Sequence, residues 1–203
     1  MGGELAKAVD LAREEDGCLS GLAFEGGLLE GADLSGMEWK EVRLAGCRFV
    51  GCELAKISFY GCVLEDCAFE GCRFQGSYWR DTALSGCKGE GCDFRGSRIK
   101  QCRWTGDRLR YANLAGSVWE KGELRECDMR ESVLSGARMK GLRLERVDLS
   151  GAELFKAELK GIDLSRCTID AITLSERCSE LVGAKIAAHQ AAVVARILGI
   201  QVE

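Results

Sequence analysis

Twelve cysteines are the residues of this 203-residue chain whose chemistry stands out first. Thiolates can bind soft metal ions or act as nucleophiles, and neighbouring thiols can form disulfides. Ten of the twelve stand two positions before an apolar residue that recurs every five residues, as at Cys62, Cys67 and Cys72. Their spacing follows this repeat rather than a Cys-x-x-Cys metal motif, so we expect free thiols that pack as small hydrophobic side chains. Cys18 and Cys178 lie outside the set and are the candidates for a more reactive thiol.

Three further residues could carry chemistry. His189 is the only histidine, and a histidine without a carboxylate or cysteine cluster forms neither a metal site nor a catalytic triad. Asp107 places a charge where the repeat otherwise holds small residues, so we expect it to accept hydrogen bonds from turn amides or pair with an arginine, or to distort the coil; a pocket is the alternative. Gly89 replaces a large side chain, and we expect Phe69 and Leu109 to fill the space rather than leave a ligand cavity. We therefore expect no enzymatic activity, no metal and no cofactor.

The element that positions these residues is a five-residue repeat. Counting in fives from 19 to 174, 31 of 32 positions are apolar, and Gly89 is the single exception. Two positions after each of these centres, from 21 to 171, glycine fills 18 of 31 places. A period of five fits neither a helix nor a plain strand, so each unit must combine a short extended side with a corner. A type II turn needs a positive φ at its second central residue, which glycine supplies.

Four such units close a square of twenty residues. We therefore predict an all-β solenoid, a right-handed quadrilateral parallel β-helix of about eight coils, about 40 Å long at about 4.8 Å per coil. Residues 1–16 are expected to form an N-terminal cap helix and 17–174 the β-helix. Residues 175–188 are expected to form a loop and the last repeats, and 189–203 a C-terminal helix and tail that mediates dimerisation. The apolar face of that last helix is wider than the end of a rod can cover, which favours a symmetric dimer. Its expected interface residues are Val193, Val194, Ile197, Leu198 and Ile200.

The units GADLSG (31–36), YANLAG (111–116) and RVDLSG (146–151) resemble the pentapeptide-repeat family, whose pattern is A(D/N)LXX. The resemblance covers roughly residues 17 to 188 and implies the same quadrilateral β-helix. The C-terminal string GAKIAAHQAAVVARILGIQV is similar to the end of the quinolone-resistance (Qnr-type) members. That similarity implies a tail-to-tail homodimer, and binding to DNA gyrase or topoisomerase IV by imitation of duplex DNA.

The charge of the chain limits this imitation. DNA of ~40 Å carries about 23 negative charges, whereas the net charge here is −4. The interpretation is therefore a partial mimic, with a candidate partner-binding acidic patch at Glu38, Glu41, Glu65, Asp66 and Glu70. A scaffold for an unrelated partner is the alternative. Direct nucleic-acid binding through the basic stretch 94–110 is a third, less favoured by the negative net charge.

Two absences complete the sequence-based expectations. The N-terminus has no basic start followed by an apolar run, so it does not look like a signal peptide. No run of eighteen apolar residues exists that could span a membrane. Together with reduced cysteines, these features favour a cytoplasmic protein.

Overall fold

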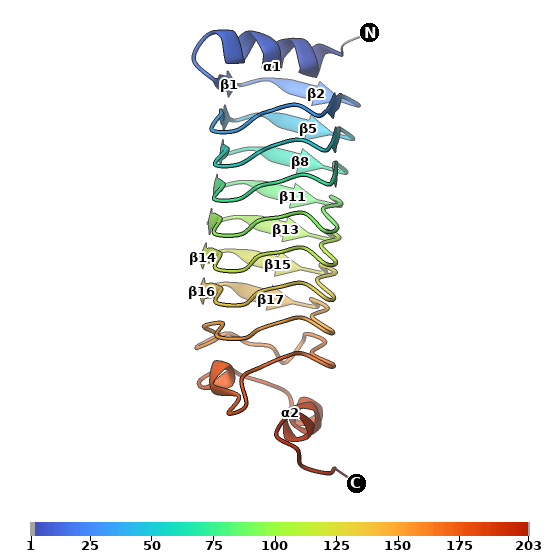
Figure 1. Cartoon of the computed structure of the whole chain (residues 1–203), viewed down its shortest axis with the longest axis vertical. Helices are drawn as coiled ribbons and strands as arrows, with labels where there is room; N and C mark the ends of the chain where they lie inside the picture. Colours follow the sequence, from blue (N-terminus) through green and yellow to red (C-terminus); the bar gives the residue numbers. More distant parts are fainter. Residues whose placement is uncertain (1–2, 203) are drawn as a thin grey trace.

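Each five-residue unit forms one extended side and one corner, as the composition of the repeat predicts. In the computed structural model, which describes residues 3–202, these units stack into a straight rod with four sides (Figure 1). Of the 31 corner positions, all 18 glycines and twelve other residues have a positive φ. At Gly71, with φ +62°, an added Cβ would meet nothing within 4 Å, so the corner selects glycine through backbone conformation and not through lack of space.

Three of the four sides contain parallel sheets whose strands are joined by twenty-residue steps. Neighbouring strands pair in exact twenty-residue register, for example Leu19 with Trp39 and Phe59 with Trp79. The first side holds β1 (Cys18–Ser20), β4 (Glu38–Lys40), β7 (Ser58–Tyr60), β10 (Tyr78–Arg80), β12 (Arg98–Lys100), β14 (Val118–Glu120) and β16 (Arg138–Lys140). The second side holds β2 (Ala23–Glu25), β5 (Arg43–Ala45), β8 (Val63–Glu65), β11 (Ala83–Ser85), β13 (Arg103–Thr105), β15 (Glu123–Arg125) and β17 (Arg143–Glu145). The third side holds β3 (Leu28–Glu30), β6 (Arg48–Val50) and β9 (Ala68–Glu70), and the fourth contains only isolated bridges.

The predicted fold class, a quadrilateral parallel β-solenoid, is confirmed, but its regular part is shorter than the eight expected coils. Seven strands stand on each of the first two sides, and they span about six turns. Beyond Glu145 the twenty-residue register continues only through isolated bridges such as Arg138 with Glu158. The difference arises because the apolar repeat continues where the extended geometry gives way to hydrogen-bonded turns, such as the one from Cys167 N to Leu164 O.

The third side changes earlier, at Gly89. Its sheet ends with β9, and from Gly89 onward its corners close with a hydrogen bond across the turn, first from Cys92 N to Gly89 O at 3.2 Å. The space left by the missing side chain is filled as expected by a neighbour, because a Cβ at Gly89 would lie 3.1 Å from Leu109 Cδ2. Leu109 of the following coil therefore occupies the space beside Gly89.

The core is one continuous column of inward-facing side chains. Its N-terminal half is aromatic: the rings of Phe74 and Phe94 stack with centroids 4.7 Å apart, and Trp79 and Trp104 meet edge to face at 5.9 Å. Its C-terminal half consists mainly of leucines. The inward cysteines fill the corners of this column, and their thiols donate to backbone carbonyls, as from Cys62 Sγ to Trp39 O at 3.3 Å.

Helices stand at both ends of the rod (Figure 1). The helix α1 (Glu4–Glu14) buries Leu5, Val9 and Ala12 against the first coil. At the other end follow two short 3-10 helices, η1 (Ser179–Leu181) and η2 (Ala188–Gln190), and the helix α2 (Ala191–Ile197). The outermost parts of the expected N-terminal cap and C-terminal tail, residues 1–2 and 203, lie outside the described residues. Within the described range, no helix has the length and apolar character needed to cross a membrane.

Candidate functional site: the C-terminal end and the sides of the rod

Two buried polar side chains anchor the C-terminal segment to the last coil. The amide nitrogen Nε2 of Gln190 donates to Leu164 O at 2.9 Å and to Cys167 O at 2.7 Å, while its Oε1 accepts from Ala187 N at 2.7 Å. The carboxylate of Glu180 accepts from Lys156 N at 2.8 Å and from Ser175 N at 3.2 Å. Burial alone would raise the pKa of Glu180, but these backbone hydrogen bonds help to hold it below its usual value. Both side chains take the place of a further coil, because they satisfy backbone groups that the next strand would otherwise pair with.

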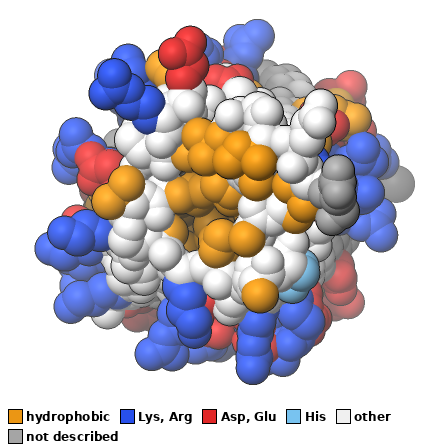
Figure 2. Space-filling view, turned by 90° about the horizontal axis from the view of Figure 1, so that it is seen from below, with side chains coloured by type: hydrophobic (Ala, Val, Ile, Leu, Met, Phe, Trp, Pro, Cys, Tyr) orange, Lys and Arg blue, Asp and Glu red, His pale blue; other side chains and the backbone are white. Residues whose placement is uncertain are grey.

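Beyond these anchors the end of the rod presents an apolar surface. Seen from this end, hydrophobic side chains gather at the centre and charged side chains surround them (Figure 2). No residue of α2 is buried. Of the five residues predicted for a dimer interface, Val193, Val194 and Ile197 are half-buried, whereas Leu198 and Ile200 are 47% and 55% exposed. The sequence analysis did not single out two further exposed residues here, Val182 and Val202.

The five acidic residues predicted as a partner-binding patch lie on different sides of the rod. Glu38 is on the first side and forms an ion pair with Lys40 at 2.6 Å, and Glu70 is on the third side, paired with Arg48 at 2.9 Å. Glu41 and Asp66 stand at the two corners that bound the second side, and Glu65 is the last residue of β8 on that side. None of these three has a basic partner within 4 Å among the described residues. The structure thus brings Glu65 and Asp66 together and separates them from Glu38 and Glu70.

The first side is the most basic surface of the rod. The outward positions of its seven strands carry six basic and two acidic side chains, whereas those of the second side carry four of each. The basic residues of the first side are Lys40, Arg80, Arg98, Lys100, Arg138 and Lys140. The basic stretch 94–110 does not form one patch, because consecutive units of the chain lie on different sides of the coil: Arg103 is on the second side and Arg98 on the first.

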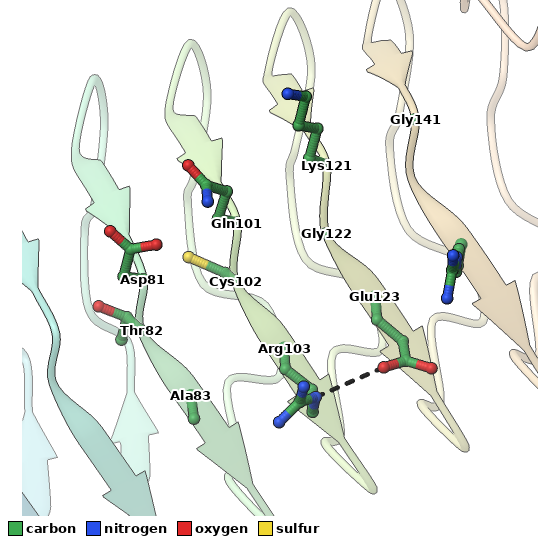
Figure 3. Close-up of a pocket in the computed structure, with 11 residues that line it drawn as sticks. Asp81, Thr82, Ala83, Gln101, Cys102, Arg103, Lys121, Gly122, Glu123 and Gly141 are labelled. Carbon is green, nitrogen blue, oxygen red and sulfur yellow. Dashed lines mark ion pairs between the residues drawn. The ribbon is translucent and has the colours of Figure 1, made fainter.

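A groove of about 430 Å³ runs along the corner between the first and second sides. Figure 3 shows Asp81, Gln101 and Lys121 on successive coils beside it, with an ion pair of 3.4 Å between Arg103 and Glu123. Gly122 lies in the wall of this groove, and a Cβ there would be only 2.9 Å from the carbonyl oxygen of Cys102, so the position has no room for a side chain. That carbonyl belongs to the coil before, so two coils approach closely at this point.

Most thiols of the interior have a raised pKa because they are buried, whereas the pKa of Cys52 is lowered by its neighbour Cys72. All twelve cysteines are free, and burial raises the pKa of the Cys102 and Cys127 thiols to about 12. Cys178 is also buried, which raises its pKa, so of the two candidate reactive thiols only Cys18 is partly exposed. His189 is exposed, and the described residues hold no group of three or more histidine, cysteine or acidic side chains able to bind a metal ion.

Asp107 is completely buried without distorting the coil. Its Oδ1 accepts a 2.7 Å hydrogen bond from Cys87 N on the preceding coil, and its Oδ2 has no partner among the described residues. Of the sequence-based expectations, the bond to a corner amide is therefore correct, whereas the pairing with arginine and the local distortion are wrong. Burial raises the pKa of Asp107 to about 7, because desolvation outweighs the hydrogen bonds from the backbone of Cys87 and Thr105.

Comparison with known proteins agrees with this architecture. The family model described as "Pentapeptide repeats (8 copies)" matches residues 28–66, 67–103, 108–141 and 133–169. These matches cover more than half of the chain. The chain belongs to the pentapeptide-repeat family.

Two of the most similar solved structures are trypsin-treated variants of QnrB1, a plasmid-mediated fluoroquinolone resistance protein. They are 25% and 22% identical to this pentapeptide-repeat protein, with TM-scores of 0.61 and 0.62, and each match covers 92% of this chain and 97% of the other. HetL, a pentapeptide-repeat protein involved in heterocyst differentiation regulation in the cyanobacterium Nostoc, is 17% identical with a TM-score of 0.37, over 83% of this chain and 86% of HetL. No curated protein sequence matches.

Proposed function

We propose that this pentapeptide-repeat protein is a non-enzymatic, dimeric interaction rod whose partner is DNA gyrase or topoisomerase IV. The observation that carries the proposal is the likeness to QnrB1, which extends over 92% of this chain and 97% of that chain. The resemblance of the last twenty residues to the Qnr type supports the same partner. We further propose a role in quinolone resistance, in the cytoplasm, where free thiols such as the twelve of this chain stay reduced.

Dimerisation through the C-terminal end is the first part of the proposal. Leu198 and Ile200 are exposed next to half-buried Val193, so a second copy would remove a contiguous apolar surface from water. In light scattering coupled to size-exclusion chromatography we expect a dimer, and a monomer for the double variant Leu198→Glu/Ile200→Glu. Leu28→Glu, a change at a 48% exposed leucine near the opposite end, should remain a dimer. A monomeric wild type contradicts this part.

Binding to a topoisomerase is the second part. The contact would involve a local acidic surface, because four sides with mixed charge cannot imitate ~40 Å of DNA. Glu65 and Asp66 are the best candidates, since they are adjacent, exposed and free of basic partners within 4 Å in the described chain.

The direct test is DNA supercoiling by gyrase, with and without a fluoroquinolone. We expect the dimer to protect gyrase from the drug, or to inhibit it, at micromolar concentration. Glu65→Lys/Asp66→Lys should abolish the effect, whereas Asp170→Lys/Glu176→Lys, with the same charge change at exposed positions, should not. No effect of the wild type on gyrase and topoisomerase IV would refute the partner but not the dimer.

One observation favours a scaffold for an unrelated partner as the second candidate. Many acidic side chains are already paired along the rod, for example Glu53 with Arg73 at 3.1 Å and Asp93 with Arg95 at 2.6 Å. Such pairs neutralise the field that a DNA mimic requires. If gyrase shows no response while the dimer is intact, this second candidate is the one to pursue.

A further inference from the structure

The outward face of the first side contains a notch between two arginines. Strand pairing places Arg98, Val118 and Arg138 directly above one another in one column of β12, β14 and β16. The short Val118 side chain lies between two long ones and leaves a groove of about 430 Å³. Tyr78, Lys100 and Glu120 complete the wall of this groove.

The positive charge at the notch is only partly neutralised within the chain. Arg98 has no acidic partner within 4 Å in residues 3–202, while Arg138 pairs with Glu158 at 3.3 Å. Lys100 and Glu120 approach only to 3.8 Å, and Lys140, next to Glu120 in the ladder, is unpaired in the same range. The two guanidinium groups therefore provide donors for an anion that could sit over Val118.

Aromatic surface continues the notch toward the N-terminal end. The rings of Tyr60 and Tyr78, on β7 and β10, lie 5.6 Å apart and are only half-buried. Tyrosine and arginine are the residue types that most often dominate binding energy at protein interfaces. This side thus combines apolar contact area with charge along one line parallel to the rod axis.

We propose that this surface, formed by Tyr78, Arg98, Lys100, Val118 and Arg138, docks an extended acidic segment of a protein partner. Arg98 and Arg138 are two strands apart, about 10 Å at about 4.8 Å per strand. A segment in the extended polyproline II conformation has three residues per turn, so carboxylates three residues apart lie on one side of it, about 9 Å apart, and both can be bound at once. The proposal is independent of gyrase and of the acidic corner discussed above.

Charge and size favour such a segment over nucleic acid. Acidic corner residues, Glu41 and Asp81, border the first side, and the whole chain is negative, with a net charge of −4. The basic part of this side, from β10 to β16, is about 15 Å long, and duplex DNA of that length carries about nine negative charges. A short acidic peptide is narrow enough to contact the basic side chains of this side without approaching the acidic residues at its border.

The test is fluorescence anisotropy of a fluorescein-labelled decaglutamate titrated with the full-length protein at low salt. We expect saturable binding that weakens as salt increases. Val118→Glu places a carboxylate between the two arginines and should weaken binding at least tenfold. Val63→Glu is the matched control: the same charge change at a half-buried valine of β8 on the second side, which should change binding less than twofold.

A second pair of variants removes the arginines without relying on the new carboxylate. Arg98→Gln/Arg138→Gln should weaken binding at least tenfold, and Arg43→Gln/Arg143→Gln on the second side should not. Absence of decaglutamate binding overturns the proposal, and so does equal weakening by the variants of both sides, which would show an effect of net charge alone. A 20-base-pair DNA duplex that binds more tightly than decaglutamate, and is lost in Val118→Glu, overturns it in favour of nucleic acid.

Discussion

The buried carboxylate of Asp107 makes the stability of this protein depend on pH in an unusual direction. In the folded chain, burial raises its pKa to about 7, whereas in the unfolded chain a carboxyl group titrates near its ordinary value of 3.8. Between about pH 4 and pH 7 the folded state therefore binds more protons than the unfolded state. Stability from this residue is complete below pH 4 and falls as the pH rises through 7.

The size of the effect follows from the shift. A difference of about three pKa units corresponds to about 4 kcal/mol, since one unit is worth 1.36 kcal/mol. The side chain is fully buried and Oδ2 has no hydrogen-bond partner in the described chain, so solvent does not screen this cost. Asp107→Asn keeps the acceptor for Cys87 N and cannot ionise, so it should be free of this dependence.

The assay is urea unfolding of the wild type and Asp107→Asn at pH 5, 6, 7 and 8. Because the loss begins near pH 4, we expect the advantage of the variant in free energy of unfolding to grow by about 3 kcal/mol between pH 5 and pH 8, with most of the change below pH 7. Other carboxylates, such as Asp163, have a pKa lowered by Ser165 and Lys185, so they make stability rise with pH. Both proteins contain them, and their effect cancels when the free energy of unfolding of the wild type is subtracted from that of the variant. Asp170→Asn, at an exposed position on the same side, is the control. A difference that stays constant from pH 5 to pH 8 would refute the reasoning.

Three further predictions concern the core, the corners and the C-terminal end. Phe74→Ala removes a fully buried ring stacked on Phe94 and should reduce the free energy of unfolding by about 3–5 kcal/mol in urea titrations. At the corners, Lys56→Gly relieves a positive φ of 57° and should raise the melting temperature, while Gly71→Ala should lower it by imposing that strain; the same sign for both variants would contradict the corner argument. Gln190→Ala removes three hydrogen bonds at the end of the coil, so amide exchange should accelerate in residues 160–190 and remain unchanged in the first coils; uniform acceleration along the rod would show that the end is not a separate unit.

Much of the architecture was predictable because the fold is a linear repetition of one local rule. The apolar centres and corner glycines specify the turn at each unit, and a shift of twenty residues then determines which side chains become neighbours. Thus the stacking of Trp79 on the column of Phe59, and the location of Arg98 and Arg138 on one side, follow directly from counting. What counting misses is the change of turn geometry at Gly89, because both geometries place a small residue and a centre inward.

The candidate surfaces were predictable only in part. A list of acidic residues close in sequence suggested one patch, but a coil turns by a right angle every five residues and distributes such a list over three sides. The exposure of Leu198 against half-burial of Val194 depends on how α2 lies on the last coil, which no repeat specifies.

The sequence by itself determined the coil, the inward cysteines and the side on which each charge lies, since all of these depend on local backbone geometry repeated in register. Only the tertiary structure decided which charges are paired, that Val118 leaves a notch between two arginines, and that Asp107 is buried with one oxygen unpartnered. Side-chain packing and desolvation depend on contacts between neighbouring coils, and the order of residues along the chain does not specify those contacts.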